Sequence, residues 1–237
     1  MTPVAGPGDL RVLEAALAVH GLCLRGSVVP AEEAAPRLSA GGAAAAIVLV
    51  GHGGGGFWPV FEAWRGAHPG LSHPLDAWSK ALIAPLAAAA GGEAVFPSDR
   101  PWHPFQQWAM AAESLKPSPL GLLIHPVYGL WHGYRGAILF SPAAAARLGL
   151  TPDAAGAAPV TSHPCDSCPD RPCLSACPVG AYSPDGFDVA GCRAYLATEA
   201  GRQGCMSGGC RARDACPVGR DHRYSDPQIR FHMAAFR

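Results

Sequence analysis

The sequence predicts an α+β fold in two domains, a larger N-terminal domain and a small cysteine-rich one. Helical and strand patterns are interspersed over the first 150 residues, whereas eight of the nine cysteines fall between Cys165 and Cys216. Between these regions lies the stretch TPDAAGAAPVTSHP, whose Pro, Gly and Ala content is typical of a connector. A chain of 237 residues, 49% of them hydrophobic, can form one medium and one small domain. We therefore expect domains at 1–150 and 151–237.

Four segments of the first domain carry apolar residues at helical spacing. The first follows Asp9, a favoured N-cap residue, and closes at Gly21. Apolar runs or alternating patterns, bounded by Gly and Pro, predict strands between the helices. The predicted helices cover 10–21, 57–66, 74–90 and 105–115. The predicted strands cover 22–29, 46–50, 93–96, 120–125 and 134–140.

The second domain shows two helical patterns. One covers 189–200, inside the cysteine region, and the other covers 226–236 at the C-terminus. We expect Asp226 to be the N-cap of the latter and Pro227 to stand in its first turn.

The charge and hydropathy patterns exclude two classes of partner. Eighteen basic and eighteen acidic residues give a formal net charge of zero, and the basic residues form no run. Nucleic acid is therefore not an expected partner. No apolar stretch reaches the roughly 20 residues that span a bilayer, and the N-terminus has no secretory pattern. We expect a cytoplasmic protein without membrane contact.

The cysteines form two runs that end alike, each in Cys-Pro-Val-Gly. In a reducing compartment, clustered cysteines usually hold metal instead of forming disulfides. A 4Fe-4S cluster needs four thiolates, and short spacings can supply three of them from one loop. The runs are Cys165-x2-Cys168-x4-Cys173-x3-Cys177-Pro178 and Cys192-x12-Cys205-x4-Cys210-x5-Cys216-Pro217.

In two-cluster ferredoxins, the cysteine before proline binds the cluster of the other run. That rule assigns Cys165, Cys168, Cys173 and Cys216 to cluster I, and Cys192, Cys205, Cys210 and Cys177 to cluster II. The alternative is a pair of four-cysteine zinc sites, which would not require the paired Cys-Pro endings. The spacing departs mildly from the tight bacterial pattern in the first run and throughout the second. Cys23 stands alone in a predicted strand and is interpreted as a small buried hydrophobe.

Two stretches carry a resemblance to known families. The cysteine pattern, with AGCRAYLATEA between its halves, resembles the ferredoxin module of epoxyqueuosine reductases and reductive dehalogenases, enzymes that feed electrons to a cobalamin. The segment LLIHPVYGLWHGYRGAILF (122–140) is similar to a signature stretch of the cobalamin-processing CblC proteins. The resemblance implies a flavin-nitroreductase-like, CblC-like domain that binds a corrinoid, followed by a small bacterial-ferredoxin-like domain with two clusters.

That resemblance implies an iron–sulfur oxidoreductase that passes electrons through two 4Fe-4S clusters to a bound cobalamin. The implied partners are an electron donor protein of the ferredoxin or flavodoxin type and a corrinoid or other small substrate. A ferredoxin-like carrier that delivers electrons to a partner enzyme, with no corrinoid bound, is the alternative. Flavin in place of corrinoid would also suit a nitroreductase-like domain.

The resemblance also suggests residues for the cofactor, although it identifies no catalytic residue. Arg135 matches an arginine that helps to bind glutathione in CblC-like proteins; an ion pair is the alternative role. Gln107 lies near the place where epoxyqueuosine reductases carry an acidic proton donor, and an amide cannot replace that acid, so epoxyqueuosine reduction is disfavoured. The expected corrinoid pocket is lined by His125, Pro126, Tyr128, Gly129 and Trp131, with Trp102 as a further contact.

A glycine-rich loop and several histidines complete the candidates. The loop 51–56 lacks the lysine of a nucleotide-binding P-loop, so we expect it to flank the corrinoid pocket. Imidazole can be an axial cobalt ligand, although an ordinary hydrogen-bonded histidine is the commoner case. The histidines considered for this role are His52, His103, His125 and His132.

Overall fold

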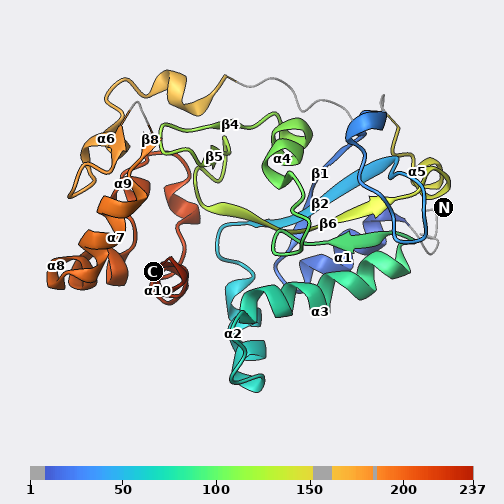
Figure 1. The fold of residues 1–237 in the computed structure, drawn as a ribbon, viewed down its shortest axis with the longest axis horizontal. Coiled ribbons are helices and arrows are strands. Elements are labelled where there is room, and N and C mark those ends of the chain that lie inside the picture. Colours follow the sequence, from blue (N-terminus) through green and yellow to red (C-terminus); the bar gives the residue numbers. More distant parts are fainter. Residues whose placement is uncertain (1–8, 152–161, 184–185, 237) are drawn as a thin grey trace. The chain divides into compact units, whose positions relative to one another are not determined.

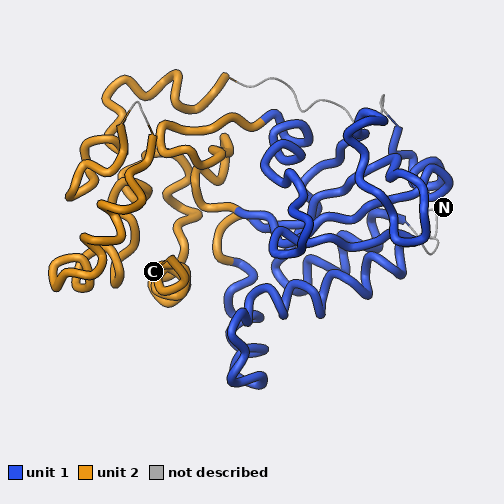
Figure 2. The backbone as a smooth tube through the Cα atoms, in the orientation of Figure 1, with its two compact units in different colours: residues 1–52, 56–114, 133–160 blue, residues 53–55, 115–132, 161–237 orange. Residues whose placement is uncertain are grey.

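The computed structural model describes residues 9–151, 162–183 and 186–236, and it mixes helices with small sheets (Figure 1). The chain divides into two compact units (Figure 2). Unit 1 contains residues 1–52, 56–114 and 133–160, and unit 2 contains 53–55, 115–132 and 161–237. Two segments that the sequence analysis assigned to the first domain, 53–55 and 115–132, thus group with the cysteine region.

Unit 1 is built on a four-stranded sheet in the order β1-β2-β6-β3. β1 pairs antiparallel with β2, and β3 pairs antiparallel with β6. The register of β1 shifts between Leu24 and Ser27, where Gly26 has a φ of +76°. A Cβ at Gly26 would lie 2.9 Å from the carbonyl oxygen of Ala112, so glycine lets the strand approach a helix closely. The strands are β1 (Cys23–Val28), β2 (Ala46–Gly53), β3 (Glu93–Val95) and β6 (His132–Phe140).

Helices supply the rest of the unit 1 core. Asp9 caps the first helix as predicted, since its side chain accepts a hydrogen bond from the Arg11 backbone N–H. The helices α1 and α4 contact β1, and α3 contacts β3. Ile47 and Leu49 of β2 and Ile138 of β6 are fully buried, as expected for central strands. The helices are α1 (Leu10–Ala18), η1 (Glu32–Ala34), α2 (Trp58–Ala67), α3 (Pro74–Ala89), α4 (Phe105–Glu113) and α5 (Pro142–Arg147).

Unit 2 consists of short helices and two-residue strands. Its small antiparallel sheets are β4 (Lys116–Pro117) with β5 (Leu123–Ile124), and β7 (Tyr182–Ser183) with β8 (Gly186–Phe187). The helices are η2 (Pro164–Ser167), α6 (Pro172–Ser175), α7 (Val189–Ala197), α8 (Glu199–Gly201), η3 (Arg202–Met206), α9 (Arg211–Asp214), η4 (Arg220–His222) and α10 (Asp226–Ala235).

Local differences from the sequence prediction lie mainly in unit 2. The expected strand 120–125 is reduced to Leu123–Ile124. The expected helix 189–200 stops at Ala197, because Thr198 is extended and its side chain caps the next helix by accepting from the Gly201 N–H. The N-cap position of α10 is Ser225, so Asp226 lies in the first turn. Within the described ranges, none of the helices is long and apolar enough to cross a membrane.

Candidate metal centre

Short helical turns position most of the cysteines of unit 2. Pro164 and Pro172 stand in the first turns of η2 and α6, where the fixed φ of proline suits a helix start. These turns carry the first three cysteines of the first run. In the second run, α7, η3 and the N-cap of α9 hold Cys192, Cys205 and Cys210. All nine cysteines of the chain carry free thiols.

The first group of four thiols lines a single cavity. It contains Cys165, Cys168, Cys173 and Cys216, so the last cysteine of the second run lies with three from the first. Cys173 and Cys216 are buried. The remaining wall is mostly apolar and comes partly from the segment 115–132, through Leu120, Ile124 and Leu130.

The thiols that line this cavity affect one another's pKa values. Burial raises the pKa of the Cys165 thiol, and the neighbouring thiols of Cys216, Cys173 and Cys168 raise it further. Burial likewise raises the pKa of Cys173, again with contributions from Cys216 and Cys168. A like charge nearby disfavours ionisation of a thiol, as expected for four cysteines that line one cavity.

The second group contains Cys177, Cys192, Cys205 and Cys210. Burial raises the pKa of the Cys192 thiol, followed by the effects of Cys210, Cys177 and Cys205. Cys177, from the first run, is thus near enough to Cys192 to raise the pKa of its thiol. Leu196, Cys205 and Met206 are buried together beside Cys192. Cys177 and Cys210 also pack against the apolar cluster that contains Cys173 and Cys216. The assignment of the eight cysteines to two separate clusters stays a prediction.

Hydrogen-bond donors point at several of these sulfurs. The Ala181 backbone N–H lies 3.3 Å from Cys177 Sγ, and the Tyr182 hydroxyl lies 3.9 Å from Cys210 Sγ. Burial raises the pKa values of Cys205 and Cys216, and backbone N–H groups of Arg211 and Val218 oppose that shift. Donors of this kind stabilise a thiolate and tune a metal that the thiolate binds.

In the part of the chain that the structure describes, no three His, Cys, Asp or Glu side chains are grouped as the ligands of a single ion would be. A zinc ion draws its sulfur ligands to about 2.3 Å from one centre. The four thiolates of a 4Fe-4S cluster bind four different iron atoms, so they stand further apart.

The loop that resembles the CblC signature lies against the second Cys-Pro turn. Gly129 has a φ of +57°, and a Cβ there would stand 2.0 Å from the carbonyl oxygen of Val218. Gly219 has a φ of +70°, and a Cβ there would stand 2.3 Å from the carbonyl carbon of Tyr128. These two glycines let the backbones of the two loops touch. This contact is one reason why 115–132 belongs to the cysteine unit.

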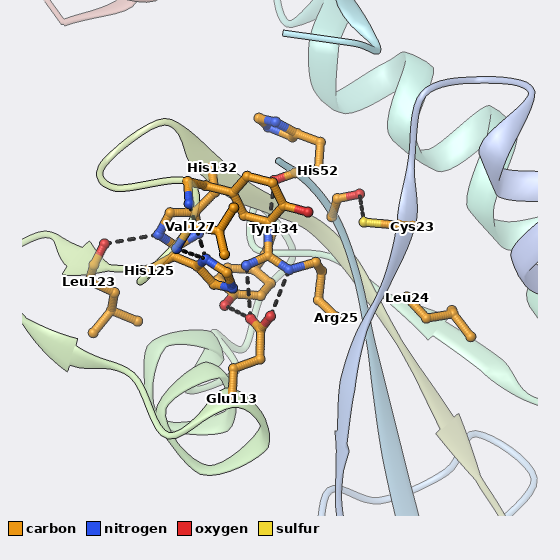
Figure 3. A network of polar contacts seen from close by, with 12 residues as sticks. Cys23, Leu24, Arg25, His52, Glu113, Leu123, His125, Val127, His132 and Tyr134 are labelled. Atoms are coloured by element: carbon orange, nitrogen blue, oxygen red, sulfur yellow. Dashed lines mark hydrogen bonds and ion pairs between the residues drawn. The ribbon is translucent and has the colours of Figure 1, made fainter. Parts of the chain in front are cut away.

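Within that loop, His125 is held by its own turn. Its Nδ1 accepts hydrogen bonds from the backbone N–H groups of Val127 and Tyr128, at 3.0 and 3.1 Å (Figure 3). Its ring stacks on Tyr128 with centroids 4.5 Å apart. His132 Nε2 lies 3.0 Å from the Leu123 carbonyl oxygen. Pro126, between these groups, is exposed.

Trp131 is buried in an aromatic group of unit 2, with 3% of its surface exposed. Its ring meets Tyr224 nearly edge-on at 5.3 Å. The Arg213 guanidinium lies 4.3 Å from the centre of the Trp131 ring, and Arg213 Nη2 donates to the Leu130 carbonyl at 2.6 Å. Contacts with Tyr224 and Arg213 therefore hold the Trp131 ring in position.

The other residues considered for the cofactor belong to unit 1. Trp102 is 70% exposed, with the Arg100 guanidinium 4.4 Å from its ring centre. Gln107 is exposed on α4. Arg135 is half-buried, and its Nε donates to the Tyr134 carbonyl oxygen at 3.0 Å. The structure thus divides the eight predicted cofactor residues between the two units.

The histidines considered as cobalt ligands differ in setting, and two of them lie in unit 1. His52 is buried, with its ring 4.4 Å from that of Phe57. His103 is half-buried, 5.4 Å from the ring of Trp108. Cys23, interpreted from the sequence as a small buried hydrophobe, is half-buried; its Sγ lies 3.7 Å from the Gly51 carbonyl oxygen, and burial raises its pKa.

A buried ion pair in unit 1 was not found from the sequence. Arg25 is 3% exposed, and its Nε and Nη2 donate to the two carboxylate oxygens of Glu113 at 2.8 and 3.0 Å (Figure 3). Tyr134 also donates to Glu113, and Arg25 Nη1 donates to the His52 carbonyl at 2.8 Å. Burial raises the pKa of Tyr134, and the Glu113 carboxylate raises it further. The only sequence signal was an arginine in an otherwise apolar strand.

Comparison with models of known protein families and with the curated proteins finds no match to this chain. The chemistry of the residues themselves therefore carries the functional argument.

Proposed function

We propose that this chain is an iron–sulfur redox protein that binds two 4Fe-4S clusters through its eight clustered cysteines. The observation that carries the proposal is the exchange of the two Cys-Pro cysteines between groups. Cys216 lines one cavity with Cys165, Cys168 and Cys173, and Cys177 raises the pKa of the Cys192 thiol. This exchange is characteristic of two-cluster ferredoxins.

The surroundings fit that assignment. Each group holds four thiols in partly buried, largely apolar surroundings, where their mutual repulsion opposes ionisation. Bound iron supplies the positive charge that makes four adjacent thiolates favourable. The N–H and O–H donors on the sulfurs suit thiolates that carry negative charge.

The chemistry of such clusters is one-electron transfer. The chain's own residues would hold them and set their environment. Leu120, Ile124 and Leu130 would shield cluster I from water, and the hydroxyl of Tyr182 would face a sulfur of cluster II. Both features affect the energy of an added electron.

The acceptor that we propose for these electrons is a corrinoid, held by a CblC-like, nitroreductase-like domain. The sequence resemblance of 122–140 supports this proposal. So does the loop of His125 to Gly129, because it lies against the turn that follows Cys216. The protein would then be a cobalamin-processing or cobalamin-dependent oxidoreductase. A carrier with an empty first domain, or one with flavin there, remains the alternative.

Anaerobic purification tests the cluster proposal. We expect a brown protein with about eight iron and eight sulfide per chain if both clusters form. Electron paramagnetic resonance of the dithionite-reduced protein should show reduced 4Fe-4S signals. A colourless preparation that contains zinc under strict exclusion of oxygen would contradict the proposal.

Titration with cobalamin tests the acceptor separately. Retention of one corrinoid per chain, with the absorbance spectrum of the base-off form, supports the proposal. A protein that carries both clusters, binds no corrinoid and rapidly reduces a partner enzyme would be a carrier. A yellow protein that retains flavin would select the remaining alternative.

A further inference from the structure

An exposed groove lies on α7 and η3, the two elements that carry Cys192 and Cys205. Four residues of α7 and η3 line it, namely Arg193, Leu196, Ala197 and Arg202. Both arginines are exposed at the rim. The Arg202 guanidinium donates to the Ala197 carbonyl oxygen, which holds that side chain along the groove.

The floor of the groove reaches the sulfurs through one buried side chain. Leu196 is 4% exposed and lies in one cluster with Cys205 and Met206, and Cys192 packs against that cluster. Arg193 directly follows Cys192 in the chain. A protein seated on the groove would contact Leu196, which packs in one cluster with Cys205 and Cys192.

The charge of the groove is positive. Along α7 to η3, from Val189 to Met206, the charged residues are Arg193, Arg202 and Glu199. Glu199 stands three residues before Arg202, and its carboxylate accepts a hydrogen bond from Gln203 Nε2 at 3.0 Å, while the two charged residues that line the groove are both basic. A positive rim around an apolar floor attracts an acidic partner and orients it during the encounter.

We infer that this groove is the docking surface for an acidic one-electron donor protein, so that electrons enter the chain at cluster II. The inference rests on the proposed function, because it requires a cluster at the second group. In the docked pair, the donor loses one electron and the cluster gains one, and no bond is made or broken.

The first group offers a matched comparison. Arg171, which is exposed, is the one charged residue among those that line its cavity. Reversing the charge at Arg171 changes the electrostatics beside the first group. Reversing it at Arg193 and Arg202 changes the electrostatics beside the second group.

Stopped-flow reduction by a plant-type 2Fe-2S ferredoxin, an acidic donor, tests the inference. At low ionic strength we expect R193E/R202E to slow the second-order rate about tenfold relative to wild type. The difference should vanish near about 0.5 M salt, where screening is strong. R193K/R202K should keep the wild-type rate, and so should R171E.

Reduced methyl viologen, a small cation that needs no docking surface, provides the reference for each variant. Its rate should not fall in R193E/R202E. Iron near eight per chain, with a normal viologen rate but an unchanged ferredoxin rate in R193E/R202E, would overturn the inference and leave the proposed function standing. Slowing by R171E alone would place electron entry at the first group and also overturn it.

Two further outcomes are separable. Wild-type protein without iron or sulfide would overturn the proposed function itself. A wild-type dimer in sedimentation velocity that dissociates in R193E/R202E would show that a second copy covers the groove, which also overturns the docking inference.

Discussion

Unit 1 and unit 2 hold their structures by different means. Unit 1 has a four-stranded sheet with buried strands, helices of up to 16 residues and a buried ion pair. Unit 2 has strands of two residues and several helices of three to five residues, gathered around cysteine sulfurs. Short elements of this kind bury little apolar surface of their own. We therefore expect unit 1 to be stable by itself, and unit 2 to depend on the clusters that we propose its thiols bind.

Removal of iron should have the largest effect and should separate the two units. After chelation under reducing, anaerobic conditions, we expect unit 2 to lose structure because metal binding supplies its folding free energy. Hydrogen exchange should show lost protection in α7, α9 and α10. Amides of β2 and β6 in unit 1 should keep their protection from exchange. Loss of protection in both units would show that unit 1 also depends on the bound iron.

Substitution of the Cys-Pro cysteines should remove one cluster at a time. Cys216→Ala should leave about four iron per chain, and Cys23→Ala should leave about eight. The double variant C168A/C216A should also keep about four iron, because both residues belong to the first group. C168A/C177A removes one ligand from each group and should bind almost none. Equal iron in the two double variants would contradict the exchange.

Breaking the buried ion pair should destabilise unit 1 alone. The Glu113 side chain is 15% exposed in the ion pair, and Arg25→Met removes the cation that faces it. We expect a loss of about 3–5 kcal/mol in the free energy of unfolding of unit 1. Denaturant unfolding followed by hydrogen exchange measures it. The iron content of the folded protein should stay near that of wild type, and its loss would show that the units depend on each other.

Gly129→Ala should have a smaller effect, confined to unit 2. Gly129 and Gly121 both have positive φ, but only the Cβ at Gly129 meets a neighbour, Val218 O at 2.0 Å. We expect a cost of about 3 kcal/mol for Gly129→Ala and about 1 kcal/mol for Gly121→Ala, the latter from backbone strain alone. Thermal unfolding of the reconstituted proteins compares the two. Equal costs would mean that the loop contact contributes nothing.

Tyr182→Phe should produce the smallest effect, a change in reduction potential without loss of iron. The hydroxyl lies 3.9 Å from Cys210 Sγ, and a donor to sulfur stabilises the more negative, reduced cluster. Its removal should therefore lower the potential of one cluster and leave the other unchanged. Redox titration monitored by electron paramagnetic resonance measures both. Tyr195→Phe, on α7 in the same unit, serves as a control.

Local patterns predicted much of the fold. The mixed helix and strand content is confirmed, and α1, α3 and β6 lie close to their predicted ranges. The helix expected over 189–200 is broken at Thr198, because a residue that suits a helix cap competes with the helical pattern. The assignment of cofactor residues such as Trp102 and Arg135 stays a prediction.

The two cysteine runs and their paired Cys-Pro endings can be recognised from the residues alone, because ligand spacing along a chain is a local property. Three other features are visible only in the folded chain: 53–55 and 115–132 group with the cysteine unit, Arg25 pairs with Glu113, and Tyr182 lies beside Cys210. Arg25 and Glu113 are 88 residues apart in the sequence, and Tyr182 and Cys210 are 28 residues apart. Such pairs depend on the path of the whole chain, and a local pattern contains no record of that path.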